Sequence, residues 1–356
     1  MSVADTRLGL IEGDGIGHEI VPATRDVLDD ALAAVGAAPV EWVPLPLGHK
    51  AIELHGHPLP ESTLAALDEL DGWVLGPHDN VSYPPEHRGV APGGVIRKRY
   101  DLFANVRPAR SFPGVRGTEM DVVVVRENTE GFYSDRNMHA GSGEFAPTPD
   151  VAMSVAVVTR AACERIAHSA FRLADGRRKH LTVVHKANVL PLTTGMFRDV
   201  VYEIAAQYPD VRVDDEHVDA MAAHLVRRPR EFDVIVAENL FGDILSDLAG
   251  ELSGSLGLAA SVNCSDRKAM AQAAHGAAPD IAGRNRANPT ALLLSGAMLL
   301  DWLGRRHADA ALVRAARRIE HAVEATFESG VATADLGGLA SRSEFTEHVR
   351  AHIRRR

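Results

Sequence analysis

Apolar and polar positions follow two different periods along this chain. Short apolar runs have the length of buried strands, and amphipathic stretches with helical spacing separate most of them. The apolar runs cover residues 8–11, 71–75, 120–125, 181–184 and 232–237. The clearest helical stretches cover residues 19–35, 159–174 and 193–207. Strands that alternate with helices predict an α/β fold with a mixed, largely parallel sheet.

Two of the predicted strands end in the same polar pair. The runs at 120–125 and 232–237 lead into Glu127-Asn128 and Glu238-Asn239. In open α/β sheets, ligands gather at the carboxyl ends of the strands. Both strand ends are therefore candidate binding positions.

A glycine-rich turn, Gly13 to Gly17, joins the first predicted strand to the first predicted helix. Such a turn lets the backbone approach a phosphate. It is neither the six-residue dinucleotide fingerprint nor a P-loop, so an ordinary tight turn is the alternative. Residues 134–150 are polar and rich in turn formers, which predicts a long loop or a protruding arm.

Composition narrows the range of partners. The 356 residues are 46% hydrophobic and carry a formal net charge of −10. This acidic balance argues against nucleic acid or an anionic membrane as the main partner. Cys163 and Cys264 lack CxxC spacing and are expected to be reduced thiols. We find neither a signal peptide pattern nor an apolar run long enough to span a membrane, and expect a cytoplasmic protein.

Three arginines, Arg97, Arg107 and Arg126, each lie beside an apolar strand or helix pattern. A planar guanidinium can bind a carboxylate through two parallel hydrogen bonds, so three converging arginines would suit a di- or tricarboxylate. The alternative is that they are surface arginines in solvated ion pairs.

Two aspartates, Asp243 and Asp247, are four residues apart where a predicted strand gives way to a helix. On a helix they share one face, where their like charges repel unless a cation lies between them. Oxygen ligands favour a hard ion such as Mg²⁺ or Mn²⁺. The alternative is that the helix dipole stabilises both carboxylates near its N-terminus.

Other candidate residues are ambiguous when taken alone. Lys186 follows a buried strand, where a lysine is costly unless it is paired or functional. Tyr133 could be catalytic or simply part of the core. The segment 275–283 is rich in turn formers and reads as a loop. Asp280 in this loop could accept hydrogen bonds from a ribose diol and would repel a 2′-phosphate, or it could be a plain turn residue.

In combination and in this order, these signals resemble the isocitrate/isopropylmalate dehydrogenase family of β-decarboxylating dehydrogenases. The matching stretches are GDGIGHEI (13–20), IRKRYDLFANVRPAR (96–110), VVRENTEGFY (124–133), HKANVL (185–190), DAMAAHLV (219–226), ENLFGDILSDLAGELSGSLGL (238–258) and HGAAPDIAGRNRANPTA (275–291). They span nearly the whole chain, and each is long and specific.

The resemblance implies an isopropylmalate-dehydrogenase-like fold, which is not a Rossmann fold. One discontinuous domain would comprise 1–104 and 255–356 and would bind the cofactor. The other, 105–254, would bind the substrate and carry the dimer contacts and the arm near 134–150. The active site would lie in the cleft between the domains and draw on both subunits of a homodimer. A tetramer remains an alternative.

The same resemblance implies residue roles. Arg97, Arg107 and Arg126 match the arginines that bind the malate moiety. Asp243 and Asp247 match ligands of Mg²⁺ or Mn²⁺, together with Asp219 from the partner subunit. Lys186, also supplied in trans, matches the general base and Tyr133 the general acid. The cofactor residues are His275, Gly276, Ala277, Ala278, Pro279, Asp280, Ile281 and Asn288 around the adenosine and Asn188 near the nicotinamide. Asp280 stands where members that use NAD carry an aspartate.

The sequence departs from the family where the third substituent of the substrate is read. Isopropylmalate enzymes have paired leucines three and four residues before the position of Arg97, where this chain has Gly94 and Gly93. The serine and asparagine of isocitrate enzymes become Ala91 and Gly93, and no arginine of the homoisocitrate kind is present. The glycines leave room but no side-chain reader. A second departure is Gln272, where many relatives carry glutamate.

We therefore expect NAD- and metal-dependent oxidative decarboxylation of a 3-substituted malate whose substituent is polar or at least not isopropyl. Residues of the polar loop 80–88 are candidate contacts for that substituent, namely Ser82 and Tyr83, or His87 or Arg88; the alternative is an exposed loop. Tartrate/malate-type and isocitrate/homoisocitrate-type activities remain alternatives. A non-catalytic regulatory subunit is the alternative of another class, although this chain keeps every residue that such subunits lose.

Overall fold

The computed structural model describes residues 6–133, 138 and 141–355. Their contacts form two compact units. The terminal unit holds the chain up to Ile96, a short segment at Phe112–Arg116, and everything from Gly254 onward. The central unit holds Arg97–Ser111 and Gly117–Ser253. The domain limits 1–104, 105–254 and 255–356 stay a prediction, and the grouping of contacts places Arg97–Ser111 with the central unit.

The terminal unit is built on five strands. They are β1 (Arg7–Ile11), β2 (Glu41–Pro44), β3 (Gly72–Leu75), β11 (Val262–Cys264) and β12 (Ala269–Ala271). Their order is β2-β1-β3-β12-β11, and every neighbouring pair is parallel except β11 with β12. The predicted strands at 8–11 and 71–75 are thus confirmed as β1 and β3. The short strands β11 and β12 were not predicted, because three residues are too few to show a period.

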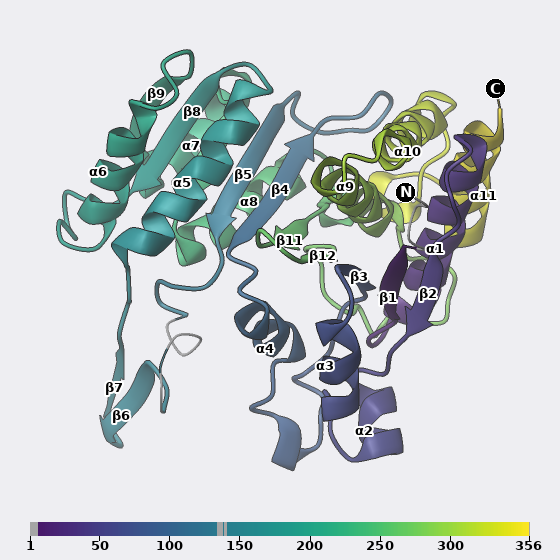
Figure 1. The fold of residues 1–356 in the computed structure, drawn as a ribbon, viewed down its shortest axis with the longest axis horizontal. Coiled ribbons are helices and arrows are strands. Elements are labelled where there is room, and N and C mark those ends of the chain that lie inside the picture. Colours follow the sequence, from purple (N-terminus) through teal and green to yellow (C-terminus); the bar gives the residue numbers. More distant parts are fainter. Residues whose placement is uncertain (1–5, 134–137, 139–140, 356) are drawn as a thin grey trace. The chain divides into compact units, whose positions relative to one another are not determined.

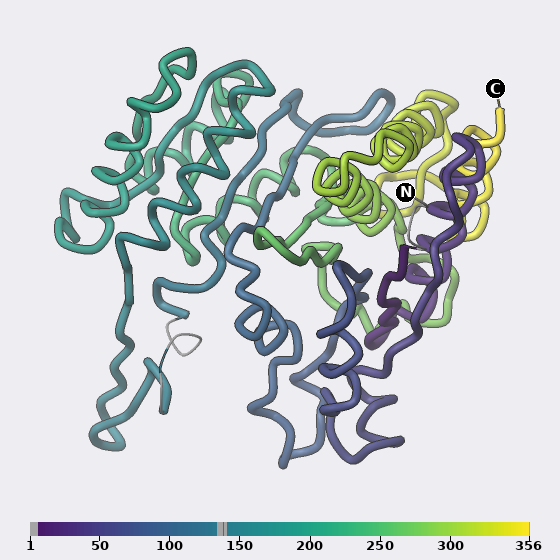
Figure 2. The backbone as a smooth tube through the Cα atoms, in the orientation of Figure 1, coloured from purple at the N-terminus to yellow at the C-terminus, as the bar shows by residue number. Residues whose placement is uncertain are grey.

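Helices from both ends of the sequence pack together in this unit. They are α1 (Gly17–Ala34), α2 (His49–His55), α3 (Glu61–Asp68), α9 (Thr290–Arg306), α10 (Ala310–Glu328) and α11 (Arg342–Arg354), with 3₁₀ turns η1 (Pro85–His87), η4 (Leu256–Leu258) and η5 (Ala334–Leu336). Helix α1 lies beside α9, α10 and α11, so the first and last parts of the described chain meet in one layer (Figure 2). Helix α4 (Pro92–Arg99) leads from this unit into the central one.

The central unit has its own five strands. They are β4 (Ala104–Arg110), β5 (Asp121–Glu127), β8 (His180–His185), β9 (Arg212–His217) and β10 (Val234–Ala237). Their order is β4-β5-β10-β8-β9, antiparallel between β4 and β5 and parallel elsewhere. Helices α5 (Arg160–Asp175) and α6 (Thr194–Ala205) cover one face, and α7 (Val218–Arg227) and α8 (Asn239–Leu252) cover the other, with η3 (Pro229–Glu231) before β10 (Figure 1).

The valine-rich strands of the central unit bury apolar side chains on both faces of its sheet. Alternate side chains of β5 and β10 point to opposite faces of the sheet. Val124 and Ile235, on one face, pack with Leu245 of α8 and Met221 of α7. This is the continuous apolar pattern expected of a strand that is buried on both faces. The α/β class and the largely parallel pairing predicted from sequence are confirmed.

The segment expected to form a loop or arm is only partly described. Residues 134–137 and 139–140 of the predicted arm lie outside the described residues. Beyond them, β6 (Glu144–Thr148) and β7 (Val151–Ser154) form a separate antiparallel pair whose side chains are all exposed. Among the described residues, no helix combines the length and apolarity that a bilayer crossing requires. Neither Cys163 nor Cys264 forms a disulfide.

The two polar strand ends lie side by side, because β5 and β10 are parallel neighbours with Arg126 paired to Ala237. A small apolar gap there is lined by Glu127, Glu130, Glu238 and the buried Cys163. Backbone and hydroxyl groups of Thr129 and Thr159 donate to Glu127 and Glu130 respectively.

Glu238 is the unsatisfied member of this group. No described residue donates a hydrogen bond to its buried Oε1. Burial, with smaller contributions from the charges of Glu127 and Glu130, raises the pKa of Glu238 to about 7. The carboxyl group is therefore accommodated most easily in its protonated form.

This geometry predicts a pH-dependent stability cost. The pKa of Glu238 in the folded chain is above its ordinary value of 4.5. The contribution of the protonated carboxyl group to the stability of the fold is therefore complete below pH 4.5 and is lost as pH rises through about 7. A shift of this size corresponds to about 3 kcal/mol. Glu238→Gln should therefore gain stability over wild type as pH rises from 5 to 8, by about 2–3 kcal/mol of unfolding free energy in denaturant titrations.

The matched control is Glu251→Gln, at an exposed position of helix α8, which begins directly after Glu238. Its stability relative to wild type should change little between the two pH values. Equal pH profiles for Glu238→Gln and wild type would show that the carboxyl group is not desolvated as the structure indicates.

Candidate active site

Two buried arginines meet two aspartates in the central unit. The Nη1 of Arg107 lies 3.3 Å from Oδ1 of Asp243 and 3.1 Å from Oδ1 of Asp247. The Nη1 of Arg126 donates to the same Oδ1 of Asp243. Arg107 and Arg126 are only 7% and 2% exposed, so both cations depend on these carboxylates for charge balance.

The pairing of β4 with β5 brings the arginines together. Asn105 of β4 is paired with Arg126 of β5, and Arg107 is two residues further along on the same face. Helix α8 covers this face, and Gly242 lets it approach closely. A Cβ at Gly242 would lie 2.7 Å from Cβ of Arg126, so only glycine fits at this contact.

The two aspartates lie one turn apart on α8, as their spacing predicted. The alternative explanation by the helix dipole does not hold, because α8 begins at Asn239 and its first turn contains no acidic residue. The dipole effect falls off within that turn. Burial is the main cause that raises the pKa of Asp247; the charge of Asp243 also raises it, and Arg107 lowers it. This arrangement gives two adjacent oxygen donors with unfavourable mutual repulsion.

Tyr133 belongs to the same cluster. Its hydroxyl donates to Oδ2 of Asp243 over 3.2 Å, and the guanidinium carbon of Arg126 lies 5.8 Å from the centre of its ring. The phenol is half-buried. Of the three predicted arginines, Arg107 and Arg126 contact this cluster directly, while Arg97 is half-buried on α4.

Lys186 and Asp219 form a second, separate pair. Lys186 follows β8 and Asp219 lies in the first turn of α7 after β9, and the parallel pairing of these strands brings the two together. The Nζ of Lys186 donates to Oδ1 of Asp219, and this bond is the main cause of a lowered pKa of the aspartate. Within the described part of one chain, no three His, Cys, Asp or Glu side chains form a group that could hold a metal.

The donor set nevertheless fits a hard divalent cation. Mg²⁺ is commonly held by one or two carboxylates, with water and substrate oxygens completing its shell. Asp243 and Asp247 supply two carboxylates on one helix face, and Asp247 is half-exposed, so its oxygens can be reached. In this chain, arginines neutralise the charges of Asp243 and Asp247. A cation could replace these arginines only if another anion bound the arginines instead.

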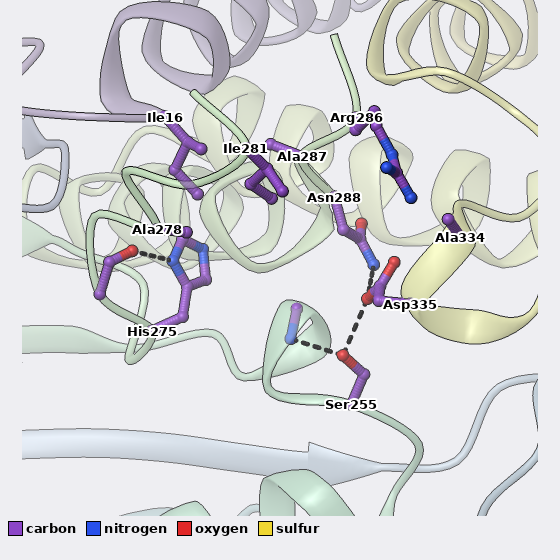
Figure 3. Close-up of a pocket in the computed structure, with 12 residues that line it drawn as sticks. Ile16, Ser255, His275, Ala278, Ile281, Arg286, Ala287, Asn288, Ala334 and Asp335 are labelled. Carbon is purple, nitrogen blue, oxygen red and sulfur yellow. Dashed lines mark hydrogen bonds between the residues drawn. The ribbon is translucent and has the colours of Figure 1, made fainter. Parts of the chain in front are cut away.

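A cavity of about 610 Å³ lies in the terminal unit, within the size range of small-molecule sites. It is drawn in Figure 3. Five of the nine predicted cofactor residues line it: His275, Gly276, Ala278, Ile281 and Asn288. The loop 275–283 has no regular structure, as predicted.

The glycine turn and this loop hold each other in place. Ile16 donates its N–H to the carbonyl of Ala277 over 2.9 Å. Gly15 has a φ of +57°, and a Cβ there would lie 2.1 Å from the same carbonyl oxygen. The turn therefore needs glycine for close backbone approach, and Ile16 becomes part of the wall of the cavity (Figure 3).

His275 offers an unused acceptor at the cavity. Its Nδ1 lies 3.1 Å from the carbonyl oxygen of Gly276, which fixes the hydrogen on that nitrogen. Its Nε2 is buried and has no partner among the described residues. Burial lowers the pKa of His275, so the ring is neutral and Nε2 carries a lone pair.

The remaining predicted cofactor residues do not line the cavity, and all but one of them are exposed. Asp280 and Pro279 are exposed, Ala277 is buried, and Asn188 is exposed in the turn after β8 in the central unit. Asn288 is fixed at both ends of its amide, because Nδ2 donates to Asp335 and Oδ1 accepts from the N–H of Thr290.

Several supporting residues escaped the sequence analysis. Ser246 accepts from Arg107 over 2.8 Å, and Asn239 accepts from Nε of Arg126 over 2.9 Å. Asp335 accepts from both Asn288 and Ser255 at the cavity (Figure 3). Of these residues, only Asn239 was marked by a local sequence pattern, because it belongs to the Glu-Asn pair at a predicted strand end. The partners of the others are distant in sequence, so no local pattern marks them.

The loop 80–88 requires a correction. Tyr83 is buried, and its hydroxyl donates to Oδ2 of Asp14 over 2.8 Å. Ser82 is engaged with His49 and with the carbonyl of Asp79. The hypothesis that Ser82 and Tyr83 contact a substrate is therefore wrong for Tyr83, whose hydroxyl anchors the loop. The contact of His87 or Arg88 with the substrate stays a prediction.

The chain is similar to known proteins over nearly its whole length. The sequence profile of the family described as isocitrate/isopropylmalate dehydrogenase matches residues 7–349. The isocitrate/homoisocitrate dehydrogenase of Thermus thermophilus is 46% identical over 96% of this chain and 97% of that protein. The 3-isopropylmalate/3-methylmalate dehydrogenase of Methanocaldococcus jannaschii is 38% identical over 98% of this chain and 99% of that protein.

The fold is also similar to that of a solved structure. The crystal structure of isocitrate dehydrogenase from Methylococcus capsulatus aligns with a TM-score of 0.85 and 39% identity, over 98% of this chain and all of that one. The relatives that share this sequence and fold are named dehydrogenases with different substrates. The chain belongs to the isocitrate/isopropylmalate dehydrogenase family, whose members are decarboxylating oxidoreductases.

Proposed function

We propose that this chain catalyses the NAD- and metal-dependent oxidative decarboxylation of a malate-type 2-hydroxy acid with a substituent at C3. The observation that carries the proposal is the single cluster of Arg107, Arg126, Tyr133, Asp243 and Asp247. It combines anion-binding, cation-binding and proton-donating groups on neighbouring elements, and the family relationship supplies the reaction class.

The arginines are assigned to the carboxylates of the substrate. Each guanidinium already binds a carboxylate in this chain, and these contacts support the assignment of both arginines to an anionic partner. Arg97 is proposed as the third member of the set. Binding both ends of a diacid fixes its C2 and C3 atoms, and this orientation contributes to the rate without any covalent step.

Asp243 and Asp247 are proposed to be the residues that would hold Mg²⁺ or Mn²⁺. A divalent cation there would stabilise the negative charge that develops on the substrate oxygen during oxidation and decarboxylation. The hydroxyl of Tyr133 donates to Asp243, and this contact supports the proposal that Tyr133 would return a proton to C3 after CO₂ leaves.

Lys186 and Asp219 are proposed to reach this cluster from a second copy of the chain. Lys186 would remove the proton of the 2-hydroxyl, and Asp219 would add a third carboxylate to the cation. Two features support an origin in trans. The two residues bind each other in one chain, and the described residues of one chain contain no three-ligand group. The proposal therefore requires a homodimer.

The cavity beside Ile16 and His275 is proposed to bind the adenosine of NAD. His275 presents a free acceptor and Asn288 a fixed amide. Asp280 is exposed at the same loop, where its carboxylate would accept hydrogen bonds from the ribose diol. When bound, NAD would supply the hydride acceptor for the reaction, and Asn188 is proposed to contact its nicotinamide end.

The proposed substrate is a diacid whose C3 substituent is polar or anionic. The helix start at Gly93 and Gly94 carries no apolar side chain, whereas an isopropyl group would gain about 1.5–3 kcal/mol from full burial. A polar or anionic substituent, as in isocitrate or homoisocitrate, fits this segment better. A tartrate- or malate-type activity is the second candidate, favoured by the same lack of a side-chain reader.

Metal dependence tests the assignment of the aspartates. Removal of bound metal with EDTA should abolish NADH formation, and Mg²⁺ or Mn²⁺ should restore it. Asp247→Asn should raise the Mg²⁺ concentration needed for half-maximal rate and lower kcat/KM about 100-fold, the equivalent of about 3 kcal/mol. Asp266→Asn, at an exposed loop position, is the control. An unchanged Mg²⁺ requirement in Asp247→Asn would exclude this residue as a ligand.

Cofactor choice tests Asp280. Asp280→Asn should lower kcat/KM for NAD about tenfold, because a charged hydrogen bond to the ribose diol is weakened. Asp280→Lys should in addition raise kcat/KM for NADP, because a repelling charge becomes an attracting one. Steady-state kinetics with both cofactors measure these ratios. If Asp280→Asn and wild type have the same NAD/NADP ratio, the discriminating group lies elsewhere in the loop.

A further inference from the structure

His185 is buried at the end of strand β8, directly before Lys186. It is 1% exposed, and both of its ring nitrogens have partners. Nδ1 accepts from the backbone N–H of Ala187 over 3.0 Å, and Nε2 lies 2.8 Å from Oδ2 of Asp215 on β9. A nitrogen that accepts cannot carry a hydrogen, so the neutral ring carries its hydrogen on Nε2 and donates it to Asp215. The ring therefore links a carboxylate to the backbone of the turn that follows the strand.

Asp215 is itself held in place as an acceptor. It lies on the same face of the sheet as His185, because His185 pairs with His217 across β8 and β9 and Asp215 is two residues before His217. Tyr202 of α6 donates to Oδ1 of Asp215 over 2.6 Å. The pKa of Asp215 is below its ordinary value: burial raises it, and the hydrogen bonds from Tyr202 and His185 more than offset this effect. The carboxylate therefore stays ionised beside the ring.

The backbone of Lys186 is fixed on both sides. Its N–H donates to Oγ1 of Thr194 over 3.0 Å, and its carbonyl oxygen accepts from the N–H of Val189 over 3.0 Å. The N–H of the following residue is the one that His185 binds. Two consecutive N–H groups are thus held by side chains and not by a strand or a helix. From this turn the amino group of Lys186 donates to Asp219 of α7.

We propose that the pair of His185 and Asp215 positions Lys186 for its role as general base. The inference rests on the proposed function, which assigns that role to Lys186. The pair acts through the backbone: it fixes the peptide between Lys186 and Ala187, and with it the direction in which the lysine side chain leaves the turn. A misplacement of about 1 Å can cost about 100-fold in rate, so one bond to this peptide is enough to affect turnover. Both members of the pair are positioning residues.

A histidine that only stabilises the fold makes a different prediction. Its loss would lower the rate by the same factor whether or not the amino group of Lys186 is present, because independent effects add as free energies. A positioning residue loses its effect on the rate once that amino group is absent.

Substitutions at His185 separate its two hydrogen bonds. An asparagine amide places an oxygen near the Nδ1 position, where it can accept from Ala187. A glutamine amide reaches the Nε2 position and Asp215 instead, and phenylalanine keeps a ring but forms neither bond. His185→Asn should therefore preserve the turn, whereas His185→Gln and His185→Phe should release it.

The experiment measures kcat for NADH formation from isocitrate and from homoisocitrate with Mg²⁺, for each His185 variant alone and combined with Lys186→Met. We expect His185→Gln and His185→Phe to lower kcat about 30- to 100-fold, and His185→Asn by no more than about threefold. In the Lys186→Met background, all three should lower the residual rate by no more than about threefold. Hydrogen exchange of the Ala187 amide is a readout without turnover, and it should be at least about tenfold faster in His185→Gln and His185→Phe than in wild type.

His180 is the matched control, because it lies at the other end of β8 and its Nε2 binds Oδ2 of Asp214 on β9 over 2.9 Å. His180→Phe should leave kcat and the exchange of the Ala187 amide within about twofold of wild type. The proposal is overturned if His185→Phe keeps the wild-type kcat, or if it lowers the rate equally with and without the lysine amino group. Wild-type kcat in Lys186→Met, or no NADH from either substrate, would instead overturn the proposed function, and the exchange rate of the Ala187 amide would then show by itself whether the pair fixes the turn.

Discussion

Charge balance between two buried arginines and two aspartates of α8 is the constraint on which the rest of the site depends. Arg107 and Arg126 are almost inaccessible to water, so each needs a carboxylate in contact. Asp243 and Asp247 provide it in the described chain. The same side chains are the proposed ligands of a diacid and of a divalent cation, so binding amounts to an exchange of ionic partners.

This constraint explains features that otherwise look unrelated. Gly242 allows α8 to approach Arg126, and Asn239 fixes the Nε of that arginine. Ser246 accepts a further hydrogen bond from Arg107. The exchange requires no rebuilding of the core, because β4, β5 and α8 are held by apolar packing that does not involve the charged groups.

The sequence predicted elements whose signals are local and missed those whose partners are distant. The valine-rich runs and the spacing of Asp243 and Asp247 are visible in short windows, and both led to the observed strands and helix face. The strand ends at Glu127 and Glu238 looked alike, but nothing in either segment showed that they would become neighbours or that burial would raise the pKa of Glu238.

The loop before α4 shows the same limit. Tyr83 read as a polar contact for a ligand because its partner, Asp14, is far away in sequence. Gly93 read as empty space because the side chain that fills that space comes from the end of β3. A glycine in a sequence marks an absent side chain, and only the fold shows which other group takes its place.

The exchange of ionic partners can be measured without turnover. The affinity for Mn²⁺ can be followed by electron paramagnetic resonance of the free ion, with and without a 2-hydroxy diacid and in the absence of NAD. If diacid carboxylates bind the arginines and leave the aspartates to the cation, the diacid should tighten Mn²⁺ binding by at least about fivefold, and Mn²⁺ should tighten diacid binding equally. Chelation of Mn²⁺ by free diacid acts in the opposite direction and cannot imitate this result. Mn²⁺ binding that is unchanged by the diacid would contradict the account.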